Sequence, residues 1–218
     1  MRITLPTGTP AELARPDDDI TPSLGVVLFP DVMGLRPLFD EMCARLAAEH
    51  GWVVCAPEPF PGEEHLEIAE RMARMPERTD EQLRADALAA ADATGCERVV
   101  ATGFCMGGML TFKAAASGRF ARAAAFYGMI RLPADWHGAL RQPIEDLASP
   151  DRCPTMAIIG GIDPYTPDAD VADAEALGVE VVRYEEADHG FVHDASRPTH
   201  RAEDAADAWR RVIAFLTA

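Results

Sequence analysis

A strand that runs directly into a glycine-rich turn and then a helix is the feature that most constrains the fold of this chain. Residues 98–102 (RVVAT) are typical of a buried strand, and Gly103-Phe104-Cys105-Met106-Gly107-Gly108 follows at once. The apolar residues after the turn predict a helix that continues to about Ser117. A direct strand–turn–helix unit of this kind indicates an α/β fold with a mostly parallel sheet.

The remainder of the chain repeats the same alternation of short apolar runs and amphipathic segments. Strands are predicted at 25–29, 52–56, 123–127, 155–159 and 180–184, and helices follow near 38–50, 66–75 and 80–94. A last helix is predicted from the apolar face that runs from Ala205 to Leu216. Thr79, with Gln82 three residues later, predicts a capped helix start. We therefore expect a single domain over residues 1–218, with helices on both faces of the sheet. The pattern does not specify the strand order.

Composition narrows the range of partners. The chain has 36 acidic against 20 basic residues, a formal net charge of -16, which disfavours nucleic acid and anionic membrane surfaces. We see no basic and apolar leader and no run of about 18 apolar residues. The five cysteines are scattered, as expected for reduced thiols in a cytoplasmic protein. A small-molecule substrate and a monomer or small homo-oligomer are expected.

Cys105 stands where the motif G-x-S-x-G places a nucleophile. In that motif a strained turn exposes the reactive side chain at the top of the sheet, and the flanking glycines avoid clashes. The helix that follows favours the thiolate and offers the Met106 amide to a developing oxyanion. The alternative is a buried structural thiol beside glycines that serve only helix packing.

Asp163 and His189 complete the pattern that a Cys105 nucleophile requires. Asp163 follows the strand at 155–159 in the sequence GGIDP, and His189 follows the strand at 180–184 in the sequence EEADHGF. Nucleophile, acid and histidine then occur in the expected chain order, each just beyond the carboxyl end of a strand. Each residue alone is equally typical of a polar loop, and Asp188 is a second candidate to orient the histidine.

Taken together, these segments resemble the dienelactone hydrolase family of the α/β-hydrolase fold. The similarity extends over nearly the whole chain, through FPDVMGL, GFCMGG, AFYG, GGIDP and ADHGF. The resemblance implies hydrolysis of an enol-lactone in the breakdown of chlorinated aromatic compounds. It also implies a thioester intermediate on cysteine and no metal or organic cofactor.

The resemblance also assigns further site residues. Asp31 occupies the position where members usually have a glutamate that holds the resting thiol, and the Val32 amide is the second oxyanion donor beside Met106. His193 occupies the neighbourhood of a carboxylate-binding arginine. Further candidates for substrate binding are Arg71, Arg74, Arg78 and Tyr127. Solvated helix positions explain the three arginines equally well.

Two other functions fit the same residues. One is a general short-chain carboxylesterase or thioesterase with the same Cys105, His189 and Asp163 triad. The other is a non-hydrolytic thiol redox protein on this fold, which would use Cys105 without needing His189.

Overall fold

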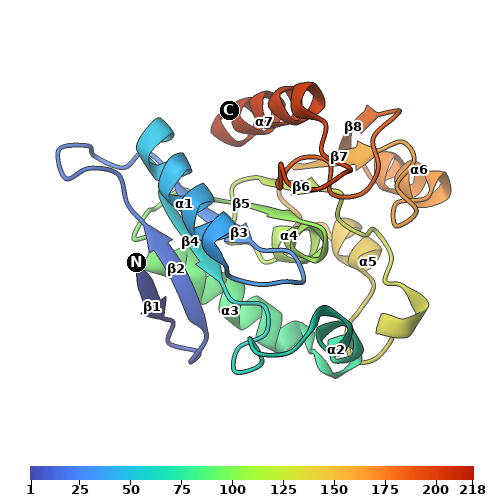
Figure 1. Ribbon diagram of the computed structural model, residues 1–218, viewed down its shortest axis with the longest axis horizontal. Helices are drawn as coiled ribbons and strands as arrows, with labels where there is room; N and C mark the ends of the chain where they lie inside the picture. The colour runs from blue at the N-terminus through green and yellow to red at the C-terminus, as the bar shows by residue number, and fades with distance from the viewer.

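The computed structural model describes residues 1–218 and contains one eight-stranded sheet, in the order β1-β2-β4-β3-β5-β6-β7-β8 (Figure 1). The first two strands and β4 pair antiparallel, and every other neighbouring pair is parallel. The predicted α/β architecture with a mostly parallel sheet is therefore confirmed. The strands are β1 (Arg2–Thr4), β2 (Pro10–Ala14), β3 (Gly25–Phe29), β4 (Val53–Pro57), β5 (Val99–Phe104), β6 (Ala123–Phe126), β7 (Thr155–Gly160) and β8 (Glu180–Tyr184).

Seven α-helices cover the two faces of this sheet. Helices α1 and α7 pack on one face, and α3 and α4 pack on the other (Figure 1). The helices are α1 (Pro37–His50), α2 (Ile68–Ala73), α3 (Asp80–Ala93), α4 (Met106–Ala115), α5 (Pro143–Leu147), α6 (Asp168–Ala176) and α7 (Ala202–Thr217). No helix combines the length and the apolar character needed to cross a membrane.

The central strands are apolar on both sides because helices cover both sides. In β3, Val26 and Leu28 join the core beneath α1 and α7, whereas Val27 and Phe29 join the core beneath α3 and α4. All five residues of β3 are buried. Parallel strands with two covered faces read as continuous apolar runs, which explains why the sequence located them well.

The differences between prediction and structure lie mainly in short or polar elements. The expected helix over 66–75 is only Ile68–Ala73, and a short 3-10 turn (Met75–Glu77) follows. Pro76 disfavours an α-helical residue before it, which explains the early end. No positions were predicted from the sequence for β1 and β2, at one end of the sheet, or for α5 and α6. Thr79 does cap α3, accepting a hydrogen bond of 3.3 Å from the Gln82 amide.

The turn between β5 and α4 has the strained geometry that the motif predicts. Cys105 has φ 58°, in the left-handed region that non-glycine residues rarely adopt. A Cβ on Gly107 would overlap the carbonyl oxygens of Phe29 and Pro30, and one on Gly108 would lie 2.7 Å from the carbonyl oxygen of Phe126. The glycines therefore let the first turn of α4 press directly against the ends of β3 and β6.

We predict that Gly107→Ala lowers the free energy of unfolding by about 3 kcal/mol or more, because the added methyl group meets backbone that cannot move independently. Gly118→Ala is the matched control, since its Cβ would meet nothing within 4 Å and only its φ of 77° is unfavourable. That variant should lose about 1 kcal/mol. Urea unfolding measures both, and equal losses would contradict the packing argument.

Candidate active site

The carboxyl ends of five strands meet at one edge of the sheet, and the candidate residues lie just beyond them. Cys105 follows β5, Asp163 lies three residues after β7, and His189 lies five residues after β8. Asp31 follows β3 in the same way, and Tyr127 follows β6 directly. In parallel sheets this edge is where ligands bind, so the topology brings residues from distant parts of the chain to one place.

His189 and Asp163 form a direct hydrogen bond. The Nδ1 atom of His189 donates to Oδ2 of Asp163 over 2.8 Å, and Oδ1 of Asp163 accepts from the Tyr165 amide at the same distance. The Asp163 side chain is fully buried. Asp188, the alternative orienting residue, instead accepts from the backbone amide of His189. The structure thus joins His189 to Asp163 rather than to its sequence neighbour.

Close packing of two loops makes this hydrogen bond possible. The Gly161 amide donates to the carbonyl of Tyr184 over 2.7 Å, and the Ile162 amide donates to that of Ala187 over 3.1 Å. A Cβ on Gly160 would lie 2.5 Å from the carbonyl oxygen of Ala187. The loop that carries Asp163 can therefore lie directly against the loop that carries His189 only because glycine occupies its start.

The second ring nitrogen of His189 is available for chemistry. Nε2 is buried and makes no hydrogen bond of normal geometry. Burial alone would lower the pKa of His189, but the hydrogen bond to Asp163 and the nearby Cys105 side chain raise it above its ordinary value. The thiol therefore lies within electrostatic reach of the imidazole. The rings of Tyr127 and Tyr165 pack edge-on against His189 at 5.1 and 4.9 Å.

The two predicted oxyanion donors are both free. Neither the Val32 amide nor the Met106 amide donates a hydrogen bond to a protein group. Met106 is the first residue of α4, where the amides have no partner within the helix. The contact of Gly107 with Phe29 and Pro30 places this helix terminus beside the loop that contains Val32. Two unpaired amides at such a junction can stabilise a developing negative charge.

Asp31 does not contact the thiol in this structure. Its carboxylate accepts two hydrogen bonds from Arg36, at 2.7 and 2.9 Å, one from Nε2 of His193 at 2.8 Å and one from the Met33 amide at 3.0 Å. Burial would raise the pKa of the Asp31 carboxyl, but the bonds from His193 and Arg36 hold it well below its ordinary value. The expected contact with Cys105 is replaced by this ionised cluster.

The arginines predicted to bind substrate are all engaged by protein groups. Arg71 is buried and donates to the carbonyls of Leu66 and Glu64, and over 3.5 Å to that of Val32. Arg74 pairs with Glu77 at 3.2 Å, and Arg78 pairs with Glu63. None of the three therefore presents a free guanidinium. The sequence reasoning missed Arg197, whose side chain makes no hydrogen bond or ion pair and lies against Gly190, the residue after His189.

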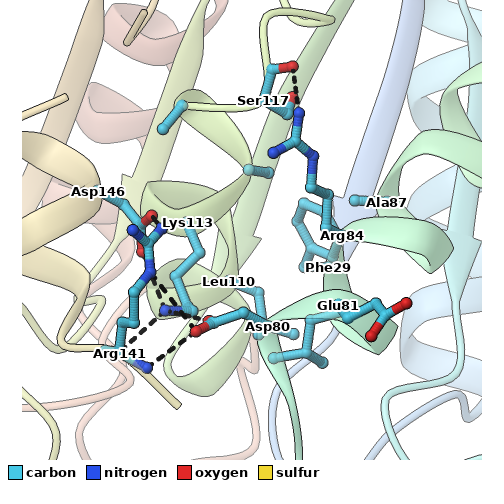
Figure 2. Close-up of a pocket in the computed structure, with 13 residues that line it drawn as sticks. Phe29, Asp80, Glu81, Arg84, Ala87, Leu110, Lys113, Ser117, Arg141 and Asp146 are labelled. Carbon is cyan, nitrogen blue, oxygen red and sulfur yellow. Dashed lines mark hydrogen bonds and ion pairs between the residues drawn. The ribbon is translucent and has the colours of Figure 1, made fainter. Parts of the chain in front are cut away.

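A cavity of about 440 Å³ lies away from this edge, between α3 and α4 (Figure 2). Four of its charged residues are paired with one another: the Lys113 amine contacts Asp80 at 2.6 Å and Asp146 at 2.9 Å, and Arg141 contacts Asp146. Arg84 donates to the carbonyl of Ser117 (Figure 2). These groups satisfy each other, so this cavity contains no reactive set comparable to Cys105 and His189.

Comparison with known proteins agrees with the fold. The structure is that of an α/β-hydrolase, and residues 9–218 match the Dienelactone hydrolase family. The chain therefore belongs to the dienelactone hydrolase family and is a carboxylic ester hydrolase.

Individual relatives span most of the chain. A protein of Escherichia coli O157:H7 named "Putative carboxymethylenebutenolidase" is 29% identical over 95% of this chain and 81% of its own length. A protein of Methylorubrum extorquens with the same name is 30% identical over 86% of this chain and 69% of its own length.

Solved structures show the same fold. A structure from Klebsiella pneumoniae, titled "Putative Dienelactone Hydrolase", has a TM-score of 0.85 and 27% identity, and it covers 100% of this chain and 97% of its own. A dienelactone hydrolase-like promiscuous phosphotriesterase from metagenomic libraries has a TM-score of 0.78 and 21% identity, with 100% and 96% coverage.

Asp31→Asn should destabilise the protein by about 3 kcal/mol at pH 7, because it leaves Arg36 and His193 without their buried anion. A carboxyl whose pKa is lower in the folded state contributes stability above its unfolded value of about 3.9, and this contribution is lost as the pH falls. The difference in the free energy of unfolding between wild type and Asp31→Asn should therefore become smaller as the pH falls from 6 to 3. Urea unfolding across this range measures it, and a difference independent of pH would contradict the ionised state of Asp31.

Proposed function

We propose that this chain hydrolyses a small ester or enol-lactone through a covalent intermediate on Cys105. The thiolate of Cys105 attacks the carbonyl carbon, and the resulting oxyanion is held by the amides of Val32 and Met106. His189 transfers the proton to the leaving oxygen and then activates the water that cleaves the thioester. Asp163 holds the His189 ring in the required tautomer and orientation.

The observation that carries this proposal is the state of His189. Its Nδ1 is fixed by the buried carboxylate of Asp163, and its Nε2 is buried and has no partner within normal hydrogen-bond geometry. The strained Cys105 lies close enough to raise the pKa of the ring. An imidazole oriented on one side and free on the other is the arrangement that a thiol nucleophile requires. A redox role for Cys105 would leave the His189–Asp163 pair without a purpose.

For the substrate, we propose an enol-lactone that carries a carboxylate. The names of the relatives support this substrate class. Arg197 also supports it, because its guanidinium lies against Gly190, beside His189, and is not paired with an anion of the protein. A general short-chain carboxylesterase or thioesterase is the second candidate. It is favoured by the engagement of Arg71, Arg74 and Arg78 with protein groups, which leaves few cations for an anionic substrate.

We expect Cys105→Ala to reduce kcat for p-nitrophenyl acetate by about 1,000-fold or more, because it removes the nucleophile. Asp163→Asn should reduce kcat by roughly 100- to 10,000-fold, because the asparagine favours the wrong tautomer of His189. Cys96→Ala, another partly exposed thiol outside the site, is the control and should retain full activity. Steady-state kinetics measure all three, and turnover by Cys105→Ala would exclude the thiol from the reaction.

Substrate class is tested by comparing kcat/KM for a dienelactone and for p-nitrophenyl acetate in wild type and in Arg197→Gln. If Arg197 binds a carboxylate, the substitution should lower kcat/KM for the dienelactone by roughly 10-fold and leave the neutral ester unchanged. Equal effects on both substrates, or none on either, would favour the general esterase.

A further inference from the structure

A second buried aspartate–histidine pair lies at the same edge of the sheet as the first. The pair is Asp31 and His193, Tyr127 is hydrogen-bonded to His193, and all three side chains are buried. The Tyr127 hydroxyl contacts Nδ1 of His193 at 2.5 Å, and Nε2 of His193 contacts Oδ2 of Asp31 at 2.8 Å. The chain of hydrogen bonds therefore joins three segments that are distant in sequence: the loop after β3, the end of β6 and the loop after β8.

The directions of these hydrogen bonds are determined by Asp31. An ionised carboxylate can only accept, so Nε2 of His193 carries a proton and donates it to Asp31. Burial lowers the pKa of His193, which keeps the ring neutral, so its Nδ1 accepts from the Tyr127 hydroxyl. Every side-chain polar atom of these three residues is paired. The hydrogen bonds run in one direction, with Tyr127 donating to His193 and His193 donating to Asp31.

The position of this chain links it to both halves of the candidate site. Asp31 directly precedes Val32, whose free amide is a proposed oxyanion donor, and it also accepts from the Met33 amide on the other side of Val32. His193 is four residues after His189, and its ring stacks on Phe104, the neighbour of Cys105, at 4.9 Å. The loop of Val32 is thus hydrogen-bonded to the loop of His189 through His193.

We infer that Asp31, His193 and Tyr127 are positioning residues that set the Val32 amide against the carbonyl oxygen of the substrate. This inference rests on the proposed function, because it concerns the oxyanion formed on attack by Cys105. This role differs from holding the thiol or binding substrate. Both carboxylate oxygens of Asp31 already accept two hydrogen bonds each, from Arg36, His193 and the Met33 amide. These three hydrogen-bonded residues affect the stabilisation of the oxyanion and leave the reactivity of the Cys105 thiol unchanged.

Two substitutions of His193 separate its two hydrogen bonds. In His193→Gln the side-chain amide reaches approximately the position of Nε2 and can still donate to Asp31. In His193→Asn the shorter amide reaches approximately the position of Nδ1, so it can still meet Tyr127 but loses Asp31. Each variant is assayed with p-nitrophenyl acetate, and each is also alkylated with iodoacetamide, in which the thiolate displaces iodide and no oxyanion forms.

We expect His193→Asn to lower kcat roughly 10- to 100-fold, because a displacement of about 1 Å in a reacting group has effects of this size. KM and the rate of alkylation should change little, since neither depends on the Val32 amide. His193→Gln should recover most of the lost kcat. Urea unfolding of each variant establishes that the assays compare folded proteins.

A second pair of variants tests the other end of the chain. Tyr127→Phe removes the hydroxyl that donates to Nδ1 of His193 but keeps the ring that packs on His189, so kcat should fall in the same direction with unchanged alkylation. Tyr184→Phe is the matched control, since its hydroxyl donates to Asp207 over 2.7 Å on α7 and its ring also packs near Phe191. It should retain full kcat.

Several results would overturn the inference. An unchanged kcat in His193→Asn, with only a loss of stability, would show a purely structural role. A parallel fall in alkylation would place the effect on the thiol, and a His193→Gln variant no better than His193→Asn would remove the contact with Asp31 from the explanation. Failure of the proposed function is distinguishable, because it appears in the wild type and Cys105→Ala before any His193 variant is compared.

Discussion

The hydrogen bond between His189 and the buried carboxylate of Asp163 is the interaction on which the chemistry of this site depends. It fixes a proton on Nδ1 and leaves Nε2 without a protein partner, in a ring whose pKa the nearby Cys105 side chain raises. The bond requires two loops to touch, and Gly160 and Gly161 permit that contact. Glycines that contribute no chemistry thus decide whether the reactive residues can act together.

The same edge of the sheet uses an aspartate–histidine pair twice, for two different purposes. In the first pair, Nε2 of His189 has no protein partner and the ring lies near the Cys105 nucleophile. In the second pair, Nδ1 of His193 is hydrogen-bonded to the buried hydroxyl of Tyr127. Only the first pair is therefore free to move a proton to or from a substrate. The second is a closed chain, and closed chains of buried polar groups serve to fix geometry. The two histidines are four residues apart, so a single loop carries both functions.

The sequence predicted most of the architecture because its central strands are buried on both faces and leave strong apolar runs. It located the Cys105 turn and the loops of Asp163 and His189 for a further reason: their glycines and their order along the chain are visible without coordinates. It did not predict that Asp31 would be held by Arg36 and His193, because that cluster depends on side chains brought together from residues 31, 36 and 193 by the sheet. The strands β1 and β2 and the helix α6 were missed because they are short or polar, and Arg197 was missed because nothing local distinguishes it from a surface arginine.

The central claim is that the sulfur of Cys105 becomes acylated during turnover. The most direct test is to mix the enzyme with p-nitrophenyl acetate, quench with acid before the steady state, and map the acetyl group by mass spectrometry of a peptic digest. Our account predicts an acetylated peptide that contains Cys105, formed as fast as the first p-nitrophenol is released. Full turnover with the acetyl group on another residue, or with no acylated enzyme at any time, would contradict it.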